Sequence, residues 1–204
     1  MSRENEKTLE VYEQHIDKFV DRFSYDPNNY GGGWIDKSLH GLPKNAKLFE
    51  VGSGTGDLAR YIISLGYSIQ TSDAANSFLK ILKEKKLNPI KFNLIKDTFN
   101  YNYDYIVANA VLVHFTPDEV KTAIQQIFNA LNQNGRFAFS VKYKAEHPNG
   151  ELDNSFGVPR YFSYWTPDEI KDVVKQTGFS KVEYVIFKGK RSNFICMTAQ
   201  KGEK

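Results

Sequence analysis

The sequence predicts a doubly wound α/β sheet of seven strands, mostly parallel with an antiparallel last strand. From residue 47 onward, short apolar segments alternate with amphipathic helical segments, which is typical of a sheet covered by helices on both faces. The last two apolar segments, residues 181–187 and 193–199, are separated by only five residues. Neighbouring strands joined by so short a turn form an antiparallel hairpin, so one strand must run against the others.

The first half of the fold carries clear signals for each element. Gly66 ends the first helix as a C-terminal glycine does, and the branched side chains of Ile69 and Thr71 favour a strand. Phe78, Leu79 and Leu82 recur at helical spacing in the second helix. The elements predicted here are strands at residues 47–51, 68–72 and 90–95 and helices at residues 57–65 and 75–86.

Capping residues mark the helices of the second half. Thr116 before Pro117 and Thr166 before Pro167 are helix starts, and Gly178 is a helix end. Residues 132–135 form a turn that launches the fifth strand. The elements predicted here are strands at residues 103–109 and 137–143, helices at 117–131 and 167–177, and the terminal hairpin.

The turn between the first strand and the first helix carries Gly52, Gly54 and Gly56. Alternate glycines let the backbone turn sharply and let a ligand approach without meeting a Cβ, and the free N–H groups of the helix start face the same place. A dinucleotide-binding turn needs its third glycine at position 57, where this chain has Asp57. The turn therefore predicts a nucleotide-like cofactor other than a dinucleotide.

The run Glu50-x-Gly52-x-Gly54-x-Gly56 resembles the first motif of class I S-adenosylmethionine-dependent methyltransferases. Residues 104–115 resemble the family's segment at the end of the fourth strand, and the reversed terminal hairpin is similar to that of its seven-stranded sheet. The resemblance covers residues 47–142. It implies a Rossmann-like methyltransferase fold, with S-adenosylmethionine as the methyl donor and S-adenosylhomocysteine as the product.

Asp73 ends the second strand about twenty residues beyond the glycine turn, where a carboxylate can accept hydrogen bonds from both ribose hydroxyls. The same acid would serve a nicotinamide enzyme, so it indicates a ribose more than a methyl donor. Asn93 stands near the position where the family contacts adenine. By resemblance, the donor contacts are Tyr12, Glu50, Gly52, Ser53, Gly54, Gly56, Asp73, Ala74, Asn93, Leu94, Asn109, Ala110 and Val111.

His114 is the histidine at the expected edge of the donor site. Methyl transfer is an in-line displacement, in which the enzyme aligns the reactants and, where necessary, removes a proton from the acceptor. The ordinary pKa of an imidazole, about 6.5, suits a general base. We therefore take His114 as the catalytic candidate, with a purely structural role in the loop as the alternative.

Several acceptors are disfavoured by missing motifs. Asn109 is followed by Ala110 and Val111, whereas enzymes that methylate nucleobase amines carry Pro-Pro-aromatic there. The single Cys196 lies in the predicted last strand, far from where a cytosine-carbon enzyme needs its nucleophile, and arsenic methylation needs several thiols. Residues 109–115 offer no carboxylate cluster for metal-assisted chemistry, so no metal is expected.

Two aromatic segments are candidates for the acceptor side. Residues 11–23 predict an amphipathic helix, followed by a Pro-, Asn- and Gly-rich hinge, and together they suggest a lid over the cofactor. In the segment after the fifth strand, Arg160 with Lys142 could hold a carboxylate or phosphate of the acceptor, the alternative for Arg160 being a surface ion pair. The residues proposed to bind the acceptor are Tyr30, Trp34, Lys142, Arg160, Tyr161 and Tyr164.

Composition sets the remaining expectations. A net charge of +3 is too small to indicate nucleic acid, and the basic cluster at residues 80–91 fits a solvated helix face. One cysteine and no long apolar run predict a cytoplasmic protein without a membrane span or disulfide. We expect a monomer or homodimer. The 204 residues predict one domain: a helical lid at 1–40, a cofactor-binding core at 47–143, a substrate-side insert at 144–165 and a closing helix and hairpin at 166–204.

Three functions remain open. The leading one is methyl transfer to an oxygen or nitrogen of a small molecule, favoured by the compact chain and the aromatic segments. The second is methylation of tRNA or protein, which the basic cluster and the Arg160 segment permit. The third is a catalytically silent module that binds S-adenosylmethionine and transfers nothing.

Overall fold

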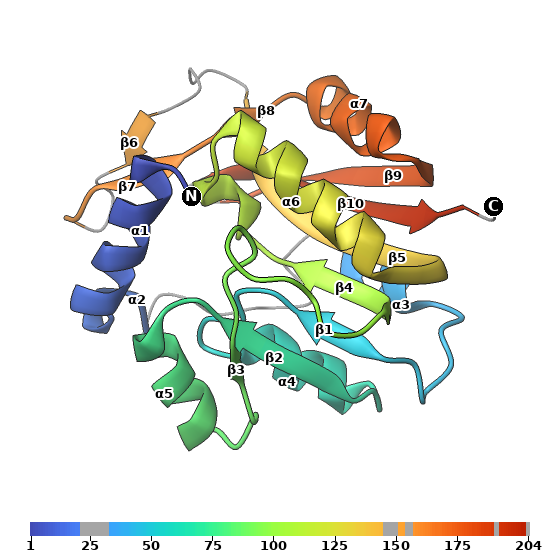
Figure 1. The fold of residues 1–204 in the computed structure, drawn as a ribbon, viewed down its shortest axis with the longest axis horizontal. Helices are drawn as coiled ribbons and strands as arrows, with labels where there is room; N and C mark the ends of the chain where they lie inside the picture. The colour runs from blue at the N-terminus through green and yellow to red at the C-terminus, as the bar shows by residue number, and fades with distance from the viewer. Residues whose placement is uncertain (21–32, 145–150, 154–156, 190–191, 203–204) are drawn as a thin grey trace.

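The computed structural model describes the chain except for residues 21–32, 145–150, 154–156, 190–191 and 203–204 (Figure 1). Its central sheet follows the order β3-β2-β1-β4-β5-β10-β9, with a short further strand, β8, paired to β5. β10 is antiparallel to both β5 and β9, so the predicted mostly parallel sheet with a reversed last strand is confirmed. The strands are β1 (Leu48–Glu50), β2 (Ile69–Asp73), β3 (Ile90–Lys91), β4 (Tyr103–Ala108), β5 (Leu131–Tyr143), β8 (Tyr164–Trp165), β9 (Phe179–Lys188) and β10 (Asn193–Lys201).

Helices cover both faces of this sheet (Figure 1). One face packs on α6 (Pro117–Ala130) and α7 (Pro167–Thr177), and the other on α3 (Trp34–Leu39) and α4 (Asp57–Ser64). The second face also buries Cys196, whose predicted core role is confirmed by an exposed fraction of 1%. Thr116 and Thr166 form capping boxes with the glutamates three residues on, which is the local reason why α6 and α7 begin where the sequence predicts.

Two predicted strand boundaries are wrong. β3 ends at Lys91 rather than at residue 95, because Asn93 Oδ1 accepts hydrogen bonds from the backbone N–H groups of Ile95 and Lys96 and so turns the chain. β5 begins at Leu131, within the predicted turn and helix end. Leu131 pairs with Tyr103, and the register then shifts, so the turn-forming residues 132–135 are accommodated as an irregularity within the strand.

The predicted N-terminal helix at residues 11–23 is also wrong over its described part, and residues 21–23 with nearly all of the hinge that follows lie outside the described residues. α1 (Arg3–Gln14) begins earlier, because the Ser2 hydroxyl caps it by accepting a hydrogen bond from the Asn5 N–H. It ends at His15, whose backbone is not helical, and a separate turn, α2 (Asp17–Val20), follows. The apolar residues on both sides of this break pack in one hydrophobic cluster, which contains Leu9, Tyr12, Ile16 and Phe19. Their spacing along the sequence stays helical, so the periodicity gives no sign of the break.

The segment before α7 contains strands that the sequence did not predict. β6 (Glu151–Asp153) and β7 (Arg160–Phe162) form a separate antiparallel pair. β8 pairs in parallel with the end of β5, opposite Lys142 and Tyr143. β7 and the end of β5 lie close to the residues that follow β4. The Ser163 N–H, directly after β7, donates a hydrogen bond to the Val113 carbonyl at 2.7 Å.

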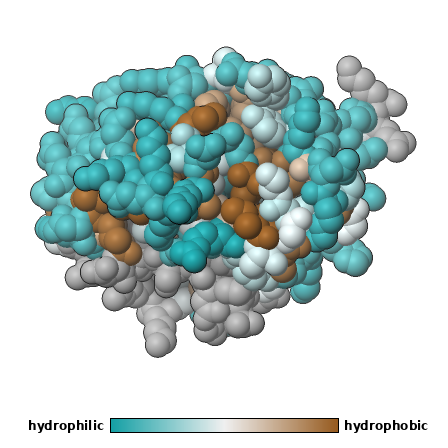
Figure 2. All heavy atoms as spheres, turned by 90° about the horizontal axis from the view of Figure 1, so that it is seen from below, coloured by the Kyte–Doolittle hydropathy of each residue, from teal (hydrophilic) through white to brown (hydrophobic). Residues whose placement is uncertain are grey.

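None of the helices in the described residues is long and apolar enough to cross a membrane. On the face seen from below in Figure 2, hydrophilic side chains cover most of the described surface, with smaller hydrophobic patches between them.

Candidate active site

The glycine turn has the shape that the sequence predicts. Gly52, Gly54 and Gly56 all have positive φ angles of 52° to 81°, a conformation that disfavours other residues. A Cβ on Gly56 would lie 2.4 Å from Leu87 Cδ1, and one on Gly52 would lie 2.6 Å from Val111 Cγ2. A Cβ on Gly54 would meet no atom within 4 Å. The first and third glycines therefore serve packing, whereas Gly54 presents bare backbone to open space.

Glu50 lies behind this turn with an exposed fraction of 2%. Burial raises the pKa of its carboxyl to about 7, while a hydrogen bond with the Ser53 side chain acts in the opposite direction. Among the described residues, Glu50 Oε2 is a buried oxygen without a hydrogen-bond partner. A buried acceptor left in this state is costly, so the site is chemically incomplete without a ligand that supplies a donor or a positive charge.

Asp73 is joined directly to the turn. Its Oδ2 accepts a hydrogen bond from the Gly54 N–H at 2.9 Å, and its Oδ1 accepts one from the Ala75 N–H at 3.0 Å. Burial raises the pKa of this carboxyl to about 6. The hydrogen bonds from the backbone N–H groups of Ala75, Gly54 and Ala74 act in the opposite direction and lower it. Asp73 thus lies beside the glycine turn, and its predicted hydrogen bonds with the ribose hydroxyls stay a prediction.

The segment after β4 closes the other side of the turn. Ala110 has a φ of 54°, and its N–H donates to Ser140 Oγ at 2.8 Å. The Ser140 hydroxyl in turn donates to Asn109 Oδ1 at 2.8 Å. Ser140 is fully buried in β5 and fixes both predicted donor contacts, yet sequence reasoning missed it. The available signal was a lone hydroxyl in the apolar run 137–141.

The predicted adenine contacts are placed less favourably. Asn93 uses its side-chain oxygen in the turn that ends β3, and its Nδ2 lies 3.4 Å from Met1 Sδ. The Leu94 side chain is 2% exposed and belongs to the hydrophobic core. Neither side chain points to a ligand through the contacts described.

His114 lies at the end of the 3-10 turn η1 (Leu112–His114), with both ring nitrogens engaged. Nδ1 lies 2.9 Å from the backbone carbonyl of Tyr161, and Nε2 lies 2.8 Å from the Tyr12 hydroxyl. Because a carbonyl can only accept, Nδ1 carries the proton and the neutral ring accepts at Nε2 from Tyr12. The Tyr12 oxygen also accepts from Arg160 Nη1 at 3.1 Å.

Two buried cations lie next to this histidine. Arg160 and Lys142 have exposed fractions of 3% and 5%. The Arg160 guanidinium carbon is 5.0 Å from the ring centre of Phe162, and Lys142 Nζ is 3.6 Å from the same centre. The His114 ring is 4.6 Å from it as well. Phe162, which the sequence did not single out, therefore contacts all three of these side chains on this side of the site.

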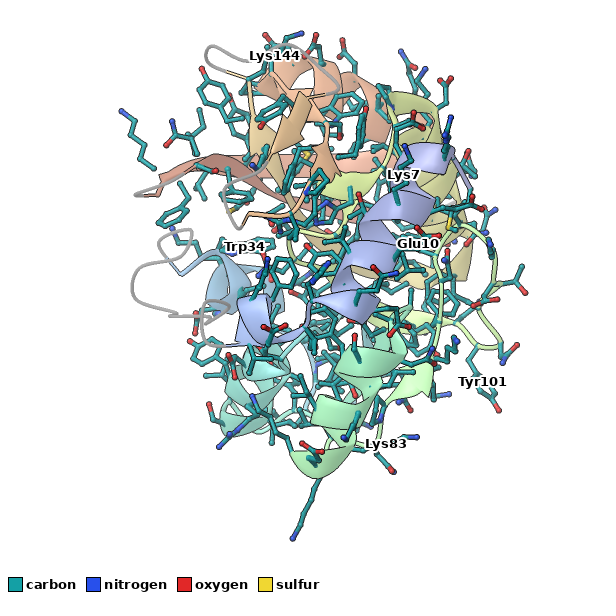
Figure 3. The ribbon with its side chains drawn as sticks, turned by 90° about the vertical axis from the view of Figure 1, so that its left-hand side faces the viewer. Lys7, Glu10, Trp34, Lys83, Tyr101 and Lys144 are labelled. Atoms are coloured by element: carbon teal, nitrogen blue, oxygen red, sulfur yellow. The ribbon has the colours of Figure 1, made fainter. Side chains whose placement is uncertain are left out.

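α1 connects the donor side to the acceptor side. The Glu13 carboxylate accepts from the N–H groups of Asn76 and Ser77 at the start of α5 (Asn76–Glu84), directly after the Asp73 segment. Thr8 Oγ1 accepts from the Tyr161 N–H at 3.0 Å. In Figure 3, α1 crosses the front of the molecule with Lys7 and Glu10 on its outer side. Thr8 was missed because the predicted helix began at residue 11, and Glu13 was missed because its partners in α5 lie more than sixty residues away.

Lys85 is a further residue that the sequence did not reveal. Its Nζ donates to the Thr55 carbonyl at 2.6 Å and lies 3.2 Å from Asp57 Oδ1. One lysine of the cluster at 80–91 therefore fastens the glycine turn rather than only facing solvent.

The remaining predicted acceptor residues are dispersed. Trp34 lies on α3 with 3% of its surface exposed, in the core between that helix and the sheet. The Tyr161 side chain lies near Glu4 and Glu119, and these charges together with burial raise its pKa. Tyr164 contacts Lys142, whose Nζ is 5.3 Å from its ring centre. Tyr30 lies outside the described residues.

The donor side fits a cationic nucleoside. It combines an open glycine turn, a buried carboxylate bonded to that turn and a second buried carboxylate with an unsatisfied oxygen. S-adenosylmethionine has a ribose diol and carries positive charge on its sulfur and amino group. Fold and site together define the class of S-adenosylmethionine-dependent methyltransferases.

Comparison with known proteins agrees with this class. Residues 12–184 match the family model described as methyltransferase domain, and the chain belongs to that family. An uncharacterised methyltransferase of Staphylococcus carnosus is 25% identical over 187 residues, which cover 84% of this chain and 90% of that protein.

Solved structures show the same fold. The complex of DhpI with S-adenosylmethionine and HEP superimposes with a TM-score of 0.78 at 15% identity, covering 98% of this chain and 99% of DhpI. Magnesium protoporphyrin IX methyltransferase of Synechocystis, with bound S-adenosylmethionine, gives a TM-score of 0.73 at 13% identity, covering 99% of each chain. The protein is therefore a methyltransferase by family, and both of these proteins of the same fold hold S-adenosylmethionine.

Proposed function

We propose that this enzyme methylates an oxygen or nitrogen of a small molecule, with His114 as the general base. The observation that carries the proposal is the hydrogen bond between Tyr12 and His114, in which the Tyr12 hydroxyl oxygen lies 2.8 Å from His114 Nε2. Bound S-adenosylmethionine supplies a methyl group on a positively charged sulfur. Every further step is assigned to residues of this chain.

Glu50, Asp73 and the backbone of residues 52–56 hold the donor. Asp73 offers the remaining lone pairs of its carboxylate to the ribose hydroxyls, and Glu50 balances positive charge behind the turn. Asn109 and Ala110, fixed by Ser140, limit where the reacting end of the donor lies. Alignment of this kind accounts for much of the rate of a displacement reaction.

Tyr12 and His114 remove the acceptor proton. The Tyr161 carbonyl holds the proton on Nδ1, so Nε2 is ready to accept one. The acceptor proton passes to the Tyr12 oxygen while Tyr12 passes its own proton to Nε2, and the Arg160 guanidinium 3.1 Å away stabilises negative charge on that oxygen during the transfer. The acceptor thus lies on the side formed by α1, β7 and the end of β5, near Arg160, Tyr164 and Lys142.

Substitution of His114 by Gln tests the base. Glutamine keeps a polar side chain but cannot take up the proton, so turnover should fall by about 10²-fold to 10⁴-fold. The affinity for S-adenosylmethionine, measured by calorimetry, should stay within about twofold, since the described contacts of the His114 ring are with Tyr12, Tyr161 and Phe162. Full turnover in this variant would exclude the base.

The acceptor is found by following consumption of S-adenosylmethionine in a fractionated metabolite extract and, separately, in a tRNA pool. Methylation of a metabolite fraction supports the proposal, whereas activity on tRNA alone would replace it. We also propose that α1 covers the bound donor, which limited proteolysis with and without S-adenosylmethionine tests through protection of residues 3–14.

A further inference from the structure

The two edges of the central sheet differ in length (Figure 1). β3, at one edge, has two residues, whereas β9, at the other edge, has ten. No strand in the described part of the chain pairs with the outer side of β9. Proteins commonly protect such an edge by keeping it short, or with a proline, a bulge or charges. β9 has no proline, and its pairing with β10 is continuous from Lys181 to Lys188, so its outer side is a regular strand edge.

The middle of β9 is apolar and exposed. Tyr184, Val185 and Ile186 have exposed fractions of 41%, 36% and 40%. The other large apolar side chains that are exposed among the described residues stand singly in the sequence. Single exposed apolar residues are normal on a protein surface, but a run of them on a strand edge indicates a contact surface. This run is therefore a candidate interface.

The backbone of this run has hydrogen-bonding groups that β10 does not use. The Gly189 N–H donates to the Ser192 carbonyl at 3.2 Å, across the turn between β9 and β10. In an antiparallel sheet, successive residues direct their backbone groups alternately to one neighbouring strand and to the other. The odd-numbered residues of β9 therefore bond to β10, and the even-numbered ones, Tyr184 and Ile186 among them, direct their N–H and C=O groups outward. A further strand can pair there.

A second copy of the same strand matches this edge. When two antiparallel copies are related by a two-fold axis, the axis passes between the two copies of one residue, because hydrogen-bonded and non-hydrogen-bonded pairs alternate. With Val185 at the axis, Tyr184 of each copy lies opposite Ile186 of the other. The three exposed apolar residues then face only one another, and the outward backbone groups of Tyr184 and Ile186 bond to each other.

The charged residues of β9 also fit this register. Lys188 of one copy lies opposite Val182 of the other, and Glu183 lies opposite Phe187. Like charges directly opposite each other destabilise a strand pair, and in this register none face each other. Moving the axis by one residue in either direction places a charged residue opposite one of the three exposed apolar side chains. The self-complementary register is therefore the one centred on Val185.

We propose that β9 is the interface of a homodimer, in which two copies pair antiparallel about Val185 and continue the sheet from one subunit into the other. The partner is a second copy of this chain. Because a two-fold pairing uses each β9 edge once, the assembly closes at two subunits. The interface lies at the sheet edge and does not depend on which acceptor the enzyme methylates.

Sedimentation velocity tests the dimer. One strand pair buries less area than a standard interface, so we expect a dissociation constant of about 10 µM, with the dimer forming as the concentration rises through that value. Val185→Lys places two like charges at the axis and should leave a monomer at about 200 µM. An unaltered protein that stays monomeric at this concentration, or a Val185→Lys variant that still dimerises, would overturn the proposal.

A matched control separates the β9 edge from exposed apolar surface in general. Ile63, on α4, has an exposed fraction of 45%, so Ile63→Lys makes a similar change away from β9 and should leave the dimer intact. The affinity for S-adenosylhomocysteine, measured by calorimetry, reports that both variants are folded. Loss of the dimer in Ile63→Lys as well would overturn the assignment to β9.

Cysteine substitution tests the register. The two copies of Val185 form a non-hydrogen-bonded pair with Cα atoms about 4.5 Å apart, which a disulfide can span. Glu183 lies two residues from the axis, so its two copies are about 13 Å apart, which is too far. With oxidised glutathione, Val185→Cys should form a covalent dimer and Glu183→Cys should not, while the native Cys196 stays buried. Equal cross-linking of both variants, or of neither, would overturn the pairing about Val185.

Discussion

The donor side and the acceptor side of this active site are built in different ways. The donor side comes from one short stretch, residues 50–56, plus the end of the neighbouring strand, and it works through backbone N–H groups and carboxylates. The acceptor side assembles side chains from α1, η1, β5 and β7, far apart in sequence, and its buried charges are positive. The methyl donor can be bound by backbone groups from one short stretch, whereas a particular acceptor requires side chains that the fold brings together.

The largest expected effect separates packing from binding within the glycine turn. Gly56→Ala puts a Cβ 2.4 Å from Leu87 and forces a positive φ on alanine, so we expect unfolding to become easier by about 4 kcal/mol. Gly54→Ala meets open space and should cost only about 1 kcal/mol, yet weaken S-adenosylmethionine binding, because its Cβ occupies the ligand side. Thermal denaturation and calorimetry on both variants measure the contrast. Equal stability losses would contradict it.

The next effect tests the raised pKa of Glu50, the buried carboxyl group behind the glycine turn. The pKa of Glu50 is raised to about 7 in the folded protein from an ordinary 4.5, so between these values the folded state holds a proton that the unfolded state releases. The free energy of unfolding of the ligand-free protein should therefore fall as pH rises through this window, by about 3 kcal/mol, and the loss should be complete above pH 7.

Urea denaturation at pH 4.5, 6 and 7.5 measures this slope. Asp73, with its pKa raised to about 6, contributes in the same direction. Glu50→Gln should flatten the part due to Glu50, and saturating S-adenosylmethionine should reduce the slope by stabilising the ionised carboxylates. A stability that rises with pH over this range would refute the assignment.

A smaller effect concerns the junction between the two sides. Ser140→Ala removes the acceptor of the Ala110 N–H and the donor to Asn109 Oδ1, both partly buried hydrogen bonds of 2.8 Å. We expect a loss of about 2 kcal/mol in stability and a fall in kcat greater than the rise in KM for S-adenosylmethionine, because the loop still closes but aligns poorly. Ser140→Cys, which retains a weak donor and similar volume, should recover part of kcat.

The smallest effect is at Lys85. Its ion pair with Asp57 is about one-third exposed on each side, so Lys85→Met should cost less than about 1 kcal/mol in stability. The hydrogen bond to the Thr55 carbonyl fastens the turn, so the affinity for S-adenosylmethionine should fall about threefold, measured by calorimetry. Lys83→Met, another lysine of α5 and labelled in Figure 3, serves as the matched control.

The same contrast explains what the sequence could predict. The glycine turn, Asp73 and the capping boxes of α6 and α7 are written in neighbouring residues, and each was found from local chemistry. The start of α1 was not found, although Ser2 caps it locally, because the predicted helix was placed by its apolar spacing from residue 11 onward. Arg160 and Lys142 were paired as candidates from residue type alone. Phe162, which brings them together, became evident only from the arrangement of β7 beside β5.

The position of α1 links the affinities for the methyl donor and the acceptor. Glu13 ties this helix to the start of α5 on one side, while Thr8 and Tyr12 tie it to β7 and η1 on the other. A ligand that settles α1 against either side has already met the entropic cost of ordering it for the second ligand. Donor and acceptor should therefore raise each other's affinity through this shared helix, in addition to the contact they make with each other for methyl transfer.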